Sequence, residues 1–425
     1  MKLNTIDFQK LKAKYPTPLY LYSGEELEDN YINLRKKMED NLEIFFSLKS
    51  NPNISIYSFL HNLGAKAEVS SLSELHTVLK CGTNPKDIIF LGPGKSIKEI
   101  NACISNNIYA LVCESIQELD IINNIAFMYN KVVDVAIRIN PSVNVKGAKL
   151  VMGGKPRQFG IDEEELLELD DSFFEKFSNV NMIGFHTYMG TRILDEHVIV
   201  ENTKIILKNA EVLSNKFNLD LKMVDIGGGL GVPYFNNEVD LNTDSLCSKL
   251  NPMIKEFKHK FPNARMIMEL GRYLTAKAGV FVTKALYVKE SRGEKFVIVD
   301  GGTNHHMAAV GIGSVIKRNF PIVCLSNLNS SPEYRYNICG PLCTPNDTLG
   351  KNVDLPHINR GDLIGIQHSG AYGPSASPTL FLSHGYPTEV LYYKNKDYLI
   401  RENDTNDDIL AKQRLHNINN IILNN

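Results

Sequence analysis

The sequence lacks three features that mark special environments. Its 425 residues carry a formal net charge of −2, so no sign of charge dominates, and we expect neither nucleic acid nor an anionic membrane as a partner. No apolar run is long enough to span a bilayer, and residues 1–7 lack the apolar core of a signal peptide. The seven cysteines contain no C-x-x-C pair, which argues against a disulfide framework or structural zinc. We therefore expect a cytoplasmic protein without a metal site.

Short apolar runs alternate with amphipathic helical patterns through much of the chain, which is long enough for two domains. Eight runs are predicted strands: Glu43–Lys49, Ala65–Ser70, Asp87–Leu91, Ala110–Glu114, Val133–Asn140, Met182–Tyr188, Met223–Ile226 and Arg265–Glu269. Eight strands with alternating helices within about 250 residues predict an α/β fold, a (β/α)8 TIM-type barrel. A doubly wound open sheet is the alternative, but a glycine triplet follows the seventh run and not the first.

The pattern changes after Arg272, where strand-like segments with turns between them replace the helices. This predicts a second, mostly antiparallel β domain, which the early segment Pro18–Tyr22 is a candidate to join. We assign residues 35–275 to the barrel, and residues 1–34 with 276–425 to the β domain. We also expect an inserted loop over Gly153–Gly160, a helix over Glu163–Phe177 and a helix over Asp408–Ile418 in the polar tail.

Lys49 ends an almost wholly apolar run and is followed by the turn residues Asn51 and Pro52. Such a run is typical of a strand buried on both faces. Desolvation at its end disfavours the ammonium form and makes the amine a usable nucleophile. We therefore expect Lys49 to form a Schiff base with a cofactor aldehyde. The alternative from this stretch alone is a lysine that caps the strand and reaches solvent.

Other predicted strands also end in groups that can bind or catalyse, and in a barrel these ends form the active site. The triplet Gly227 to Gly229 leaves bare backbone N–H groups, which can wrap a phosphate after the seventh strand. Glu269 ends the eighth strand, where a carboxylate facing a pyridine nitrogen would keep that nitrogen protonated. An ion pair of Glu269 with Arg272 or Arg138 is the alternative.

Seven motifs follow one another along the chain: Ser47 to Asn51, Glu68 to Leu75, Gly92 to Lys95, Gly227 to Gly229, Glu269 with Gly271 and Arg272, Gly340 to Cys343, and Gly370 to Gly373. Together they resemble the fold-type III pyridoxal-phosphate decarboxylases, the ornithine, diaminopimelate and arginine decarboxylase group. The resemblance implies pyridoxal 5'-phosphate as cofactor, Lys49 as the Schiff-base lysine and Glu269 as partner of the pyridinium nitrogen. It also implies a head-to-tail homodimer in which Cys343 of the second subunit helps return a proton to the product carbanion.

The catalytic residues expected from this resemblance are therefore Lys49, Glu269 and Cys343. The cofactor-binding residues expected are Lys49, Glu68, Arg138, Tyr188, Thr191, Gly227, Gly228, Gly229, Glu269, Gly271, Arg272 and Tyr372. Of these, the glycine triplet, Gly271, Arg272 and Tyr372 would hold the phosphate, and Thr191 matches a phosphate-contacting serine of the family.

Departures from the family pattern narrow the substrate. Tyr188 stands where the family has a histidine on the ring face, with His186 two residues earlier, and an aromatic side chain can still stack there. Thr344 stands where enzymes for diamino substrates carry an acid, with Asp347 three residues further on. His305 and His306 lie where diaminopimelate enzymes bind the distal carboxylate. We take Thr344, Asp347, His305 and His306 as candidate substrate residues; adjacent histidines on an extended chain point apart, which argues against a metal pair.

Several local runs resemble a narrower subgroup, the butirosin-pathway type that decarboxylates glutamate tethered to an acyl carrier protein, and more loosely the siderophore-pathway decarboxylases. They are Met152 to Gly160, Tyr188 to Thr191, Gly302 to His306 and Pro341 to Pro345. Both subgroups handle amino acids whose far end is an acyl or amide group. A neutral Thr344 fits such a substrate.

The sequence thus predicts an enzyme, a carboxy-lyase that decarboxylates an L-amino acid or amino-acyl conjugate at Cα in antibiotic or siderophore biosynthesis. Carrier-bound glutamate is the first candidate substrate. Diaminopimelate and a siderophore intermediate are alternatives. A racemase of the alanine type, or a catalytically dead binding homologue, is a further alternative.

Overall fold

The computed structural model describes residues 1–142, 150–151, 156–311 and 318–416. The chain forms two compact units. The first comprises Met1, Ser23–Gly279 and His368–Tyr372; the second comprises Lys2–Tyr22, Val280–Gln367 and Gly373–Asn425. The first unit starts earlier than the predicted residue 35 because helix α2 (Gly24–Arg35) packs on α3 (Ile54–Asn62), α10 (Arg272–Thr275) and the 3-10 turn η5 (Ala276–Ala278).

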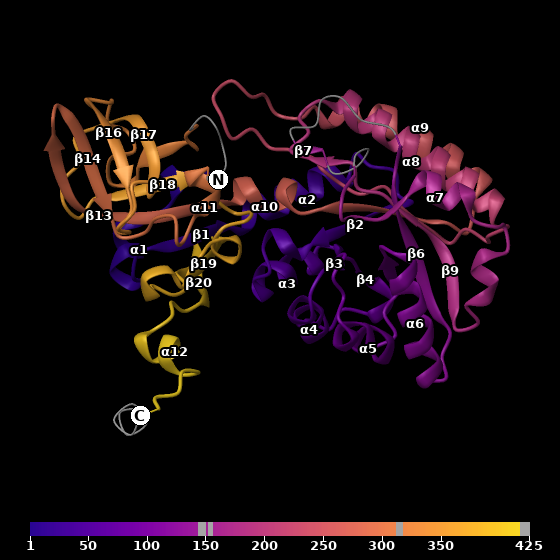
Figure 1. The fold of residues 1–425 in the computed structure, drawn as a ribbon. Helices are drawn as coiled ribbons and strands as arrows, with labels where there is room; N and C mark the ends of the chain where they lie inside the picture. Colours follow the sequence, from indigo (N-terminus) through magenta and orange to yellow (C-terminus); the bar gives the residue numbers. More distant parts are fainter. Residues whose placement is uncertain (143–149, 152–155, 312–317, 417–425) are drawn as a thin grey trace. The chain divides into compact units, whose positions relative to one another are not determined.

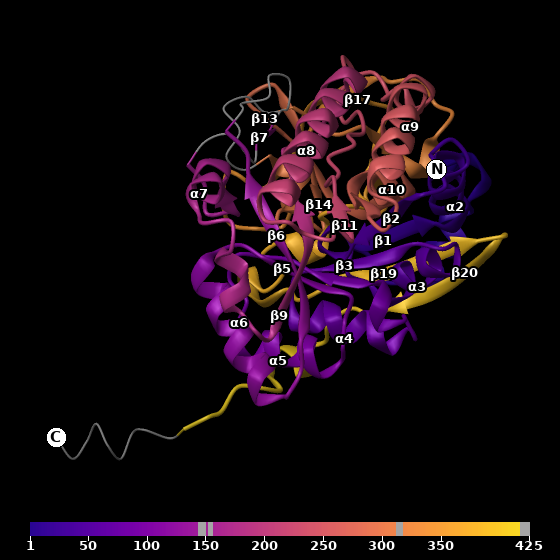
Figure 2. The same ribbon diagram turned by 90° about the vertical axis from the view of Figure 1, so that its right-hand side faces the viewer.

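A closed barrel of parallel strands forms the centre of the first unit (Figures 1 and 2). Its eight strands, in order around the barrel, are β2 (Leu42–Ser47), β3 (Lys66–Val69), β4 (Ile88–Phe90), β5 (Ala110–Cys113), β6 (Val133–Asn140), β9 (Val180–His186), β11 (Met223–Asp225) and β12 (Arg265–Leu270). Parallel pairing of β12 with β2 closes the ring, with Glu269 opposite Phe45. The predicted TIM-type barrel is confirmed, and each predicted strand lies where the apolar run placed it.

Helices follow most barrel strands. They are α3, α4 (Leu72–Lys80), α5 (Ile97–Ser105), α6 (Ile116–Met128), α7 (Glu163–Glu168), α8 (Glu196–Lys216) and α9 (Thr243–Lys260). Three of them begin at a serine whose hydroxyl accepts the backbone N–H of a glutamate three residues later, at Ser71, Ser96 and Ser115. Such caps set where each helix starts, so the preceding loop, which carries site residues, is short and fixed.

The predicted helix Glu163–Phe177 is wrong in its second half. Helix α7 ends at Glu168 because Leu169 is extended, and a separate 3-10 turn, η4, covers Phe173–Lys176. The break falls at Asp170, Asp171 and Ser172, whose side chains compete with helical hydrogen bonds. Of the predicted loop Gly153–Gly160, residues 153–155 lie outside the described part of the chain.

The barrel interior is filled by side chains from successive strands, among them Phe45, Ile89, Val112, Ala136 and Ile267, all at most 1% exposed. A packed interior leaves only the strand ends for chemistry.

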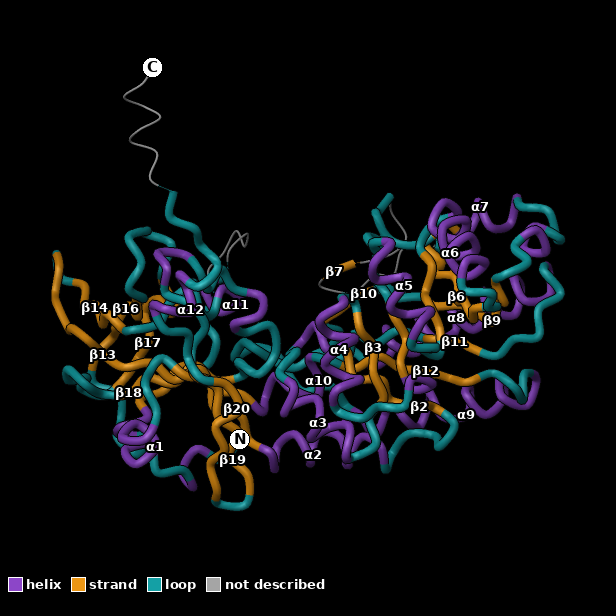
Figure 3. The backbone as a smooth tube through the Cα atoms, turned by 90° about the horizontal axis from the view of Figure 1, so that it is seen from below, coloured by secondary structure: helices purple, strands orange, loops and turns teal. Residues whose placement is uncertain are grey.

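The second unit is built mainly from strands (Figure 3). They are β1 (Leu19–Ser23), β13 (Gly279–Ser291), β14 (Glu294–Val299), β15 (Ile322–Cys324), β16 (Tyr334–Cys339), β17 (Thr348–Leu355), β18 (Leu363–Gln367), β19 (Thr388–Tyr393) and β20 (Lys396–Arg401). The pairs β13–β14, β13–β18, β15–β18, β16–β17 and β19–β20 are antiparallel, and β14 pairs with β16 in parallel. The predicted β domain is confirmed, and β1 joins it between β13 and β19.

Three short strands and the remaining helices complete the chain. The strands are β7 (Leu150–Val151), β8 (Ile161–Asp162) and β10 (Gly190–Thr191), and the helices are α1 (Phe8–Lys14), α11 (Met307–Val310) and α12 (Asn406–Leu410). The tail helix therefore ends well before the predicted Ile418, which lies outside the described residues. Within the described ranges, no helix combines the length and apolar character needed to cross a membrane.

An ionic network ties four strands together at their amino ends. The guanidinium of Arg265 on β12 bonds Glu43 on β2 at 2.7 Å and Asp87, just before β4, at 2.6 Å. Lys66 on β3 pairs with both carboxylates. The aromatic ring of Tyr109 lies 4.5 Å from the guanidinium carbon. Such a network at the amino ends of barrel strands indicates a role in stability.

We predict that Arg265→Met lowers the free energy of unfolding by about 2 kcal/mol, because hydrogen bonds to charged groups contribute about that much. Burial alone would raise the pKa values of Glu43 and Asp87, but the hydrogen bonds from Arg265 and Lys66 outweigh burial and lower both pKa values. Their contribution is therefore present above the ordinary carboxyl pKa of about 4 and is lost as the pH falls through the folded-state values. Urea unfolding at pH 7 and at pH 3 measures both effects; an equal loss at the two pH values would contradict the assignment.

Candidate active site

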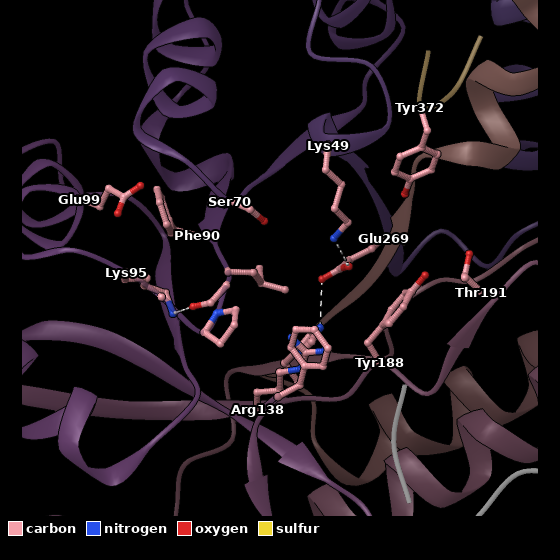
Figure 4. Close-up of a pocket in the computed structure, with 16 residues that line it drawn as sticks. Lys49, Ser70, Phe90, Lys95, Glu99, Arg138, Tyr188, Thr191, Glu269 and Tyr372 are labelled. Carbon is pink, nitrogen blue, oxygen red and sulfur yellow. Dashed lines mark hydrogen bonds and ion pairs between the residues drawn. The ribbon is translucent and has the colours of Figure 1, made fainter. Parts of the chain in front are cut away.

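Lys49 lies directly after β2, in the 3-10 turn η2 (Leu48–Ser50), at the carboxyl end of the barrel. Its amine is 2.9 Å from Glu68 Oε2 and 3.8 Å from Glu269 Oε2. These carboxylates come from β3 and β12, the two strands that flank β2. Both are only 1% exposed, whereas the lysine side chain is 38% exposed into the cavity in front of it (Figure 4). The closed ring thus dictates which acids meet Lys49.

The expected loss of basicity at Lys49 is wrong for this arrangement. Burial alone would lower the pKa of Lys49, but the negative charges of Glu68 and Glu269 outweigh burial and raise the pKa above its ordinary value. The amine is therefore held charged and fixed between two acids. A nucleophilic amine requires that its proton first pass to another group, and the two neighbouring carboxylates are the nearest acceptors.

Glu269 is bound by different partners from those considered in the sequence. His186 Nε2, at the end of β9, lies 3.1 Å from Glu269 Oε1, with both side chains at most 1% exposed. Burial would raise the pKa of Glu269, but Lys49 and His186 outweigh burial and lower it to about 2. Arg138 pairs instead with Glu114 at 3.0 Å, and Arg272 donates to the Tyr234 hydroxyl at 2.9 Å. Glu269 is thus an ionised carboxylate facing the cavity.

Asp225, the last residue of β11, was not found from the sequence. Its Oδ1 accepts the Gly227 N–H at 2.8 Å, which anchors the start of the glycine triplet. Burial and the neighbouring charge of Glu269 raise the pKa of Asp225 well above its ordinary value, which favours the neutral form of this carboxyl group. A ring nitrogen of His186 and a carboxylate oxygen each of Asp225 and Glu269 all lie within 4.8 Å of one another. The sequence contains a signal for Asp225, because it is the only acid in its predicted strand and lies two residues before the glycine triplet.

A recess of about 20 Å³ adjoins Lys49 on one side, and its walls include Thr191, Gly229, Gly271, Arg272 and Tyr372. The guanidinium of Arg272 stacks 4.6 Å from the Tyr372 ring, and its buried Nε has no hydrogen-bond partner within the described part of the chain. A buried unpaired donor on a charged group is costly unless an anion binds it.

The glycine triplet is required by close packing at this edge. A Cβ on Gly228 would lie 1.7 Å from the backbone oxygen of Glu269, so no other residue fits there without moving the end of β12. The backbone between β11 and the next turn is therefore bare and lies directly against the strand that carries Glu269. Bare backbone N–H groups and a guanidinium are the kinds of donor that bind an anion such as a phosphate.

A larger cavity of about 500 Å³ lies in front of Lys49, Tyr188 and Tyr372 (Figure 4). Its lining also includes Ser70, Phe90, Leu91, Pro93, Lys95, Glu99, Arg138 and Phe159. Two cationic side chains that line this cavity, Lys95 and Arg138, are paired with acids. Lys95 pairs with Glu118 at 2.7 Å and donates to the Gly92 carbonyl at 2.7 Å. Arg138 pairs with Glu114 and lies 4.7 Å from the Phe159 ring. The cavity therefore presents apolar surface, two paired cations and the carboxylate of Glu99, which accepts hydrogen bonds from Ser96 and from the Leu72 N–H.

The remaining predicted residues belong to the second unit. Cys343 is exposed, and Thr344 is half-buried. His305 and His306 are buried; burial lowers the pKa of His305 to about 4, and its Nε2 lies 3.2 Å from the Gly385 carbonyl. Asp347 is buried, and donors of its own unit occupy both of its carboxylate oxygens. The two histidines and Asp347 are thus buried within the second unit.

Comparison with known proteins decides the family. A family model described as "Pyridoxal-dependent decarboxylase, pyridoxal binding domain" matches residues 25–276. The chain belongs to the pyridoxal-dependent decarboxylases. It is 38% identical to the L-glutamyl-[BtrI acyl-carrier protein] decarboxylase of Niallia circulans, over 97% of each chain. It is 30% identical to the diaminopimelate decarboxylase of Helicobacter pylori J99, over 95% of this chain and 97% of that one.

Solved structures agree with this family. The diaminopimelate decarboxylase of Helicobacter pylori with bound L-lysine superposes with a TM-score of 0.85 at 29% identity, covering 95% of this chain and 98% of that one. The enzyme is a carboxy-lyase whose cofactor is pyridoxal 5'-phosphate. The cavity fits this cofactor, because it offers an amine at Lys49, an ionised acid at Glu269 and an unpaired guanidinium nitrogen beside a bare backbone loop.

We predict that Arg272→Met raises the dissociation constant of pyridoxal phosphate by about 10- to 100-fold, because one charged hydrogen-bonding group contributes about 1.5–3 kcal/mol. Titration of the cofactor-free protein, followed by absorbance, measures the constant. The matched control is Arg335→Met, which removes an exposed guanidinium paired with Asp354 in the second unit. An unchanged constant in Arg272→Met would place the phosphate elsewhere.

Proposed function

We propose that this decarboxylase acts on glutamate carried as a thioester on an acyl carrier protein, with its active site shared between two copies of the chain in the cytoplasm. The proposed catalytic activity rests on one observation: the amine of Lys49 is held between two buried carboxylates at the carboxyl end of the barrel. The substrate part rests on the Niallia circulans relative, whose name states this substrate, and on the neutral Thr344 beside Cys343.

Each residue has a distinct part in the proposed reaction. Lys49 would hold the aldehyde carbon of the cofactor, and the ionised Glu269 would accept a hydrogen bond from its protonated ring nitrogen and so keep that nitrogen protonated. Arg272 and the N–H groups of Gly227 to Gly229 would hold its phosphate, with Tyr188 against its ring. When bound, the cofactor supplies the electron sink that takes up the bonding pair as carbon dioxide leaves Cα.

The chain also supplies orientation and proton return. Asp225 and Glu269 lie side by side, and the pKa of Asp225 is raised while that of Glu269 is lowered to about 2, so Glu269 is the acid that would offer charge to the ring nitrogen. Cys343 of a second copy would return the proton to Cα, and Lys49 would then release the amine. The apolar lining of the cavity, and the pairing of Lys95 and Arg138 with acids, favour a substrate whose far end carries no free carboxylate.

We predict that Lys49→Ala loses the visible absorbance of bound cofactor and lowers kcat by at least about a thousandfold, because no other amine takes its place. Gel filtration followed by absorbance, and carbon dioxide release, measure the two effects. Lys289→Ala, on the exposed end of β13, is the control for loss of one lysine. Survival of both colour and turnover in Lys49→Ala would overturn the assignment.

The substrate is tested by carbon dioxide release from purified protein with added pyridoxal phosphate. The panel is carrier-bound glutamate, the pantetheine thioester of glutamate, free glutamate, citryl-amino acids, ornithine and diaminopimelate. We expect kcat/KM for carrier-bound glutamate to exceed that for every free amino acid by at least about a hundredfold, a difference of about 2.7 kcal/mol in transition-state binding. The pantetheine thioester separates recognition of the arm from recognition of the carrier protein.

Diaminopimelate decarboxylation is the second candidate, favoured by the 30% identity to the Helicobacter pylori enzyme. If diaminopimelate gave the highest kcat/KM in the panel, this second function would replace the first. Turnover of a citryl-amino acid above all others would indicate the siderophore type. Racemisation without carbon dioxide release, or no reaction with any substrate, would contradict both decarboxylase proposals.

A further inference from the structure

The loop at residues 340–347, between β16 and β17, carries Cys343 at its exposed middle. Its last residue, Asp347, is only 3% exposed. Asp347 Oδ1 accepts hydrogen bonds from the backbone N–H of Thr303 at 2.6 Å and from its hydroxyl at 2.8 Å. Asp347 Oδ2 accepts the Leu342 N–H at 2.8 Å. One carboxylate thus joins the loop after β14 to the loop after β16.

The backbone of Asp347 completes the connection. Its N–H donates to the Thr344 carbonyl at 3.1 Å, and its own carbonyl accepts the Gly340 N–H at 3.0 Å. The residue before Cys343 and the residue after it are therefore both bonded to Asp347. The backbone at Cys343 is fixed on both sides while its thiol remains exposed.

Two glycines make room for this carboxylate. A Cβ placed on Gly302 or on Gly340 would lie 2.3 Å from an oxygen of Asp347, well inside contact distance. The buried charge is tolerated because donors satisfy both oxygens. We call this packed unit the Asp347 clamp; it consists of Gly302, Thr303, Gly340, Leu342 and Asp347. A surface loop without a function to support would not require such packing.

We propose that Asp347 is a positioning residue that acts through Cys343, holding its thiol in the orientation from which it returns a proton to the substrate carbon. This inference rests on the proposed function, which gives Cys343 its role. It replaces our expectation from sequence that Asp347 contacts the substrate. A firmly held loop preserves the catalytic rate, since a small misplacement of a reacting group lowers that rate.

The test is Asp347→Asn in the cofactor-loaded enzyme, assayed with the best substrate of the panel. The amide has the same shape, but its NH2 group would meet a donor, either Leu342 N–H or Thr303, so one side of the clamp opens. We expect kcat to fall about tenfold with KM changed less than about twofold, because the substrate itself is untouched. The cofactor absorbance should remain unchanged.

A second readout does not depend on turnover. All seven cysteines lie in the described part of the chain, and Cys343 is the exposed one. Its alkylation by iodoacetamide, followed by mass spectrometry, should be at least about threefold faster in Asp347→Asn, as expected for a loop that opens locally. Thr303→Val, which removes the hydroxyl donor but leaves the N–H, should give a smaller change of the same kind. Asn346→Ala, in the same loop with an exposed side chain outside the clamp, is the matched control.

A double-mutant cycle decides whether Asp347 acts through the thiol. In a Cys343→Ala background, adding Asp347→Asn should cost less than about twofold in kcat. If the two losses multiply instead, Asp347 acts by another route and the inference fails while the role of Cys343 stands. If Cys343→Ala alone keeps full kcat, the proposed role of Cys343 fails, and this inference fails with it. An unchanged alkylation rate in Asp347→Asn would also overturn the inference.

Discussion

The ion pairs of Lys49 with Glu68 and Glu269 are the constraint on which the active site depends. They exist only because the barrel closes. Glu68 comes from the strand after β2, whereas Glu269 comes from the last strand, which pairs with β2 to complete the ring. Residues 49 and 269 are far apart in the sequence, so an open sheet that separated β2 from β12 would leave Lys49 with one acid. Closure therefore sets the charge of the amine and the orientation of its side chain.

The barrel and the rim of the site could be predicted because their signals are local. Short apolar runs bounded by turn residues gave each strand, and the residue at each carboxyl end then became a candidate. The pKa of Lys49 could not be predicted in this way. The sequence shows burial, which lowers the pKa of a lysine, but the opposing acids become neighbours only in the closed ring. The same reason hid the contact of His186 with Glu269, which joins two strands separated by β11.

Asp347 shows a different limit of sequence reasoning. Its position three residues after Thr344 suggested a polar contact with substrate, yet its partner Thr303 lies 44 residues away in the chain. The sequence does contain a trace of the clamp, since Gly302 and Gly340 both stand where a side chain would collide with the carboxylate. A glycine in a loop has many explanations, however, and only the folded second unit shows that these two serve the same buried acid.

Asp225 and Glu269 show how one layer of the barrel holds two carboxyl groups in different states. Both are fully buried, so burial favours the neutral form of each. Glu269 faces two cationic or hydrogen-bonding neighbours, Lys49 and His186, and stays ionised. Asp225 faces the charge of Glu269, which raises its pKa. Two like charges at this distance in a dry site would repel strongly, so the ionisation of one acid favours the neutral form of the other. The charged acid is the one that lines the cavity, where its proposed role beside a protonated ring nitrogen requires it.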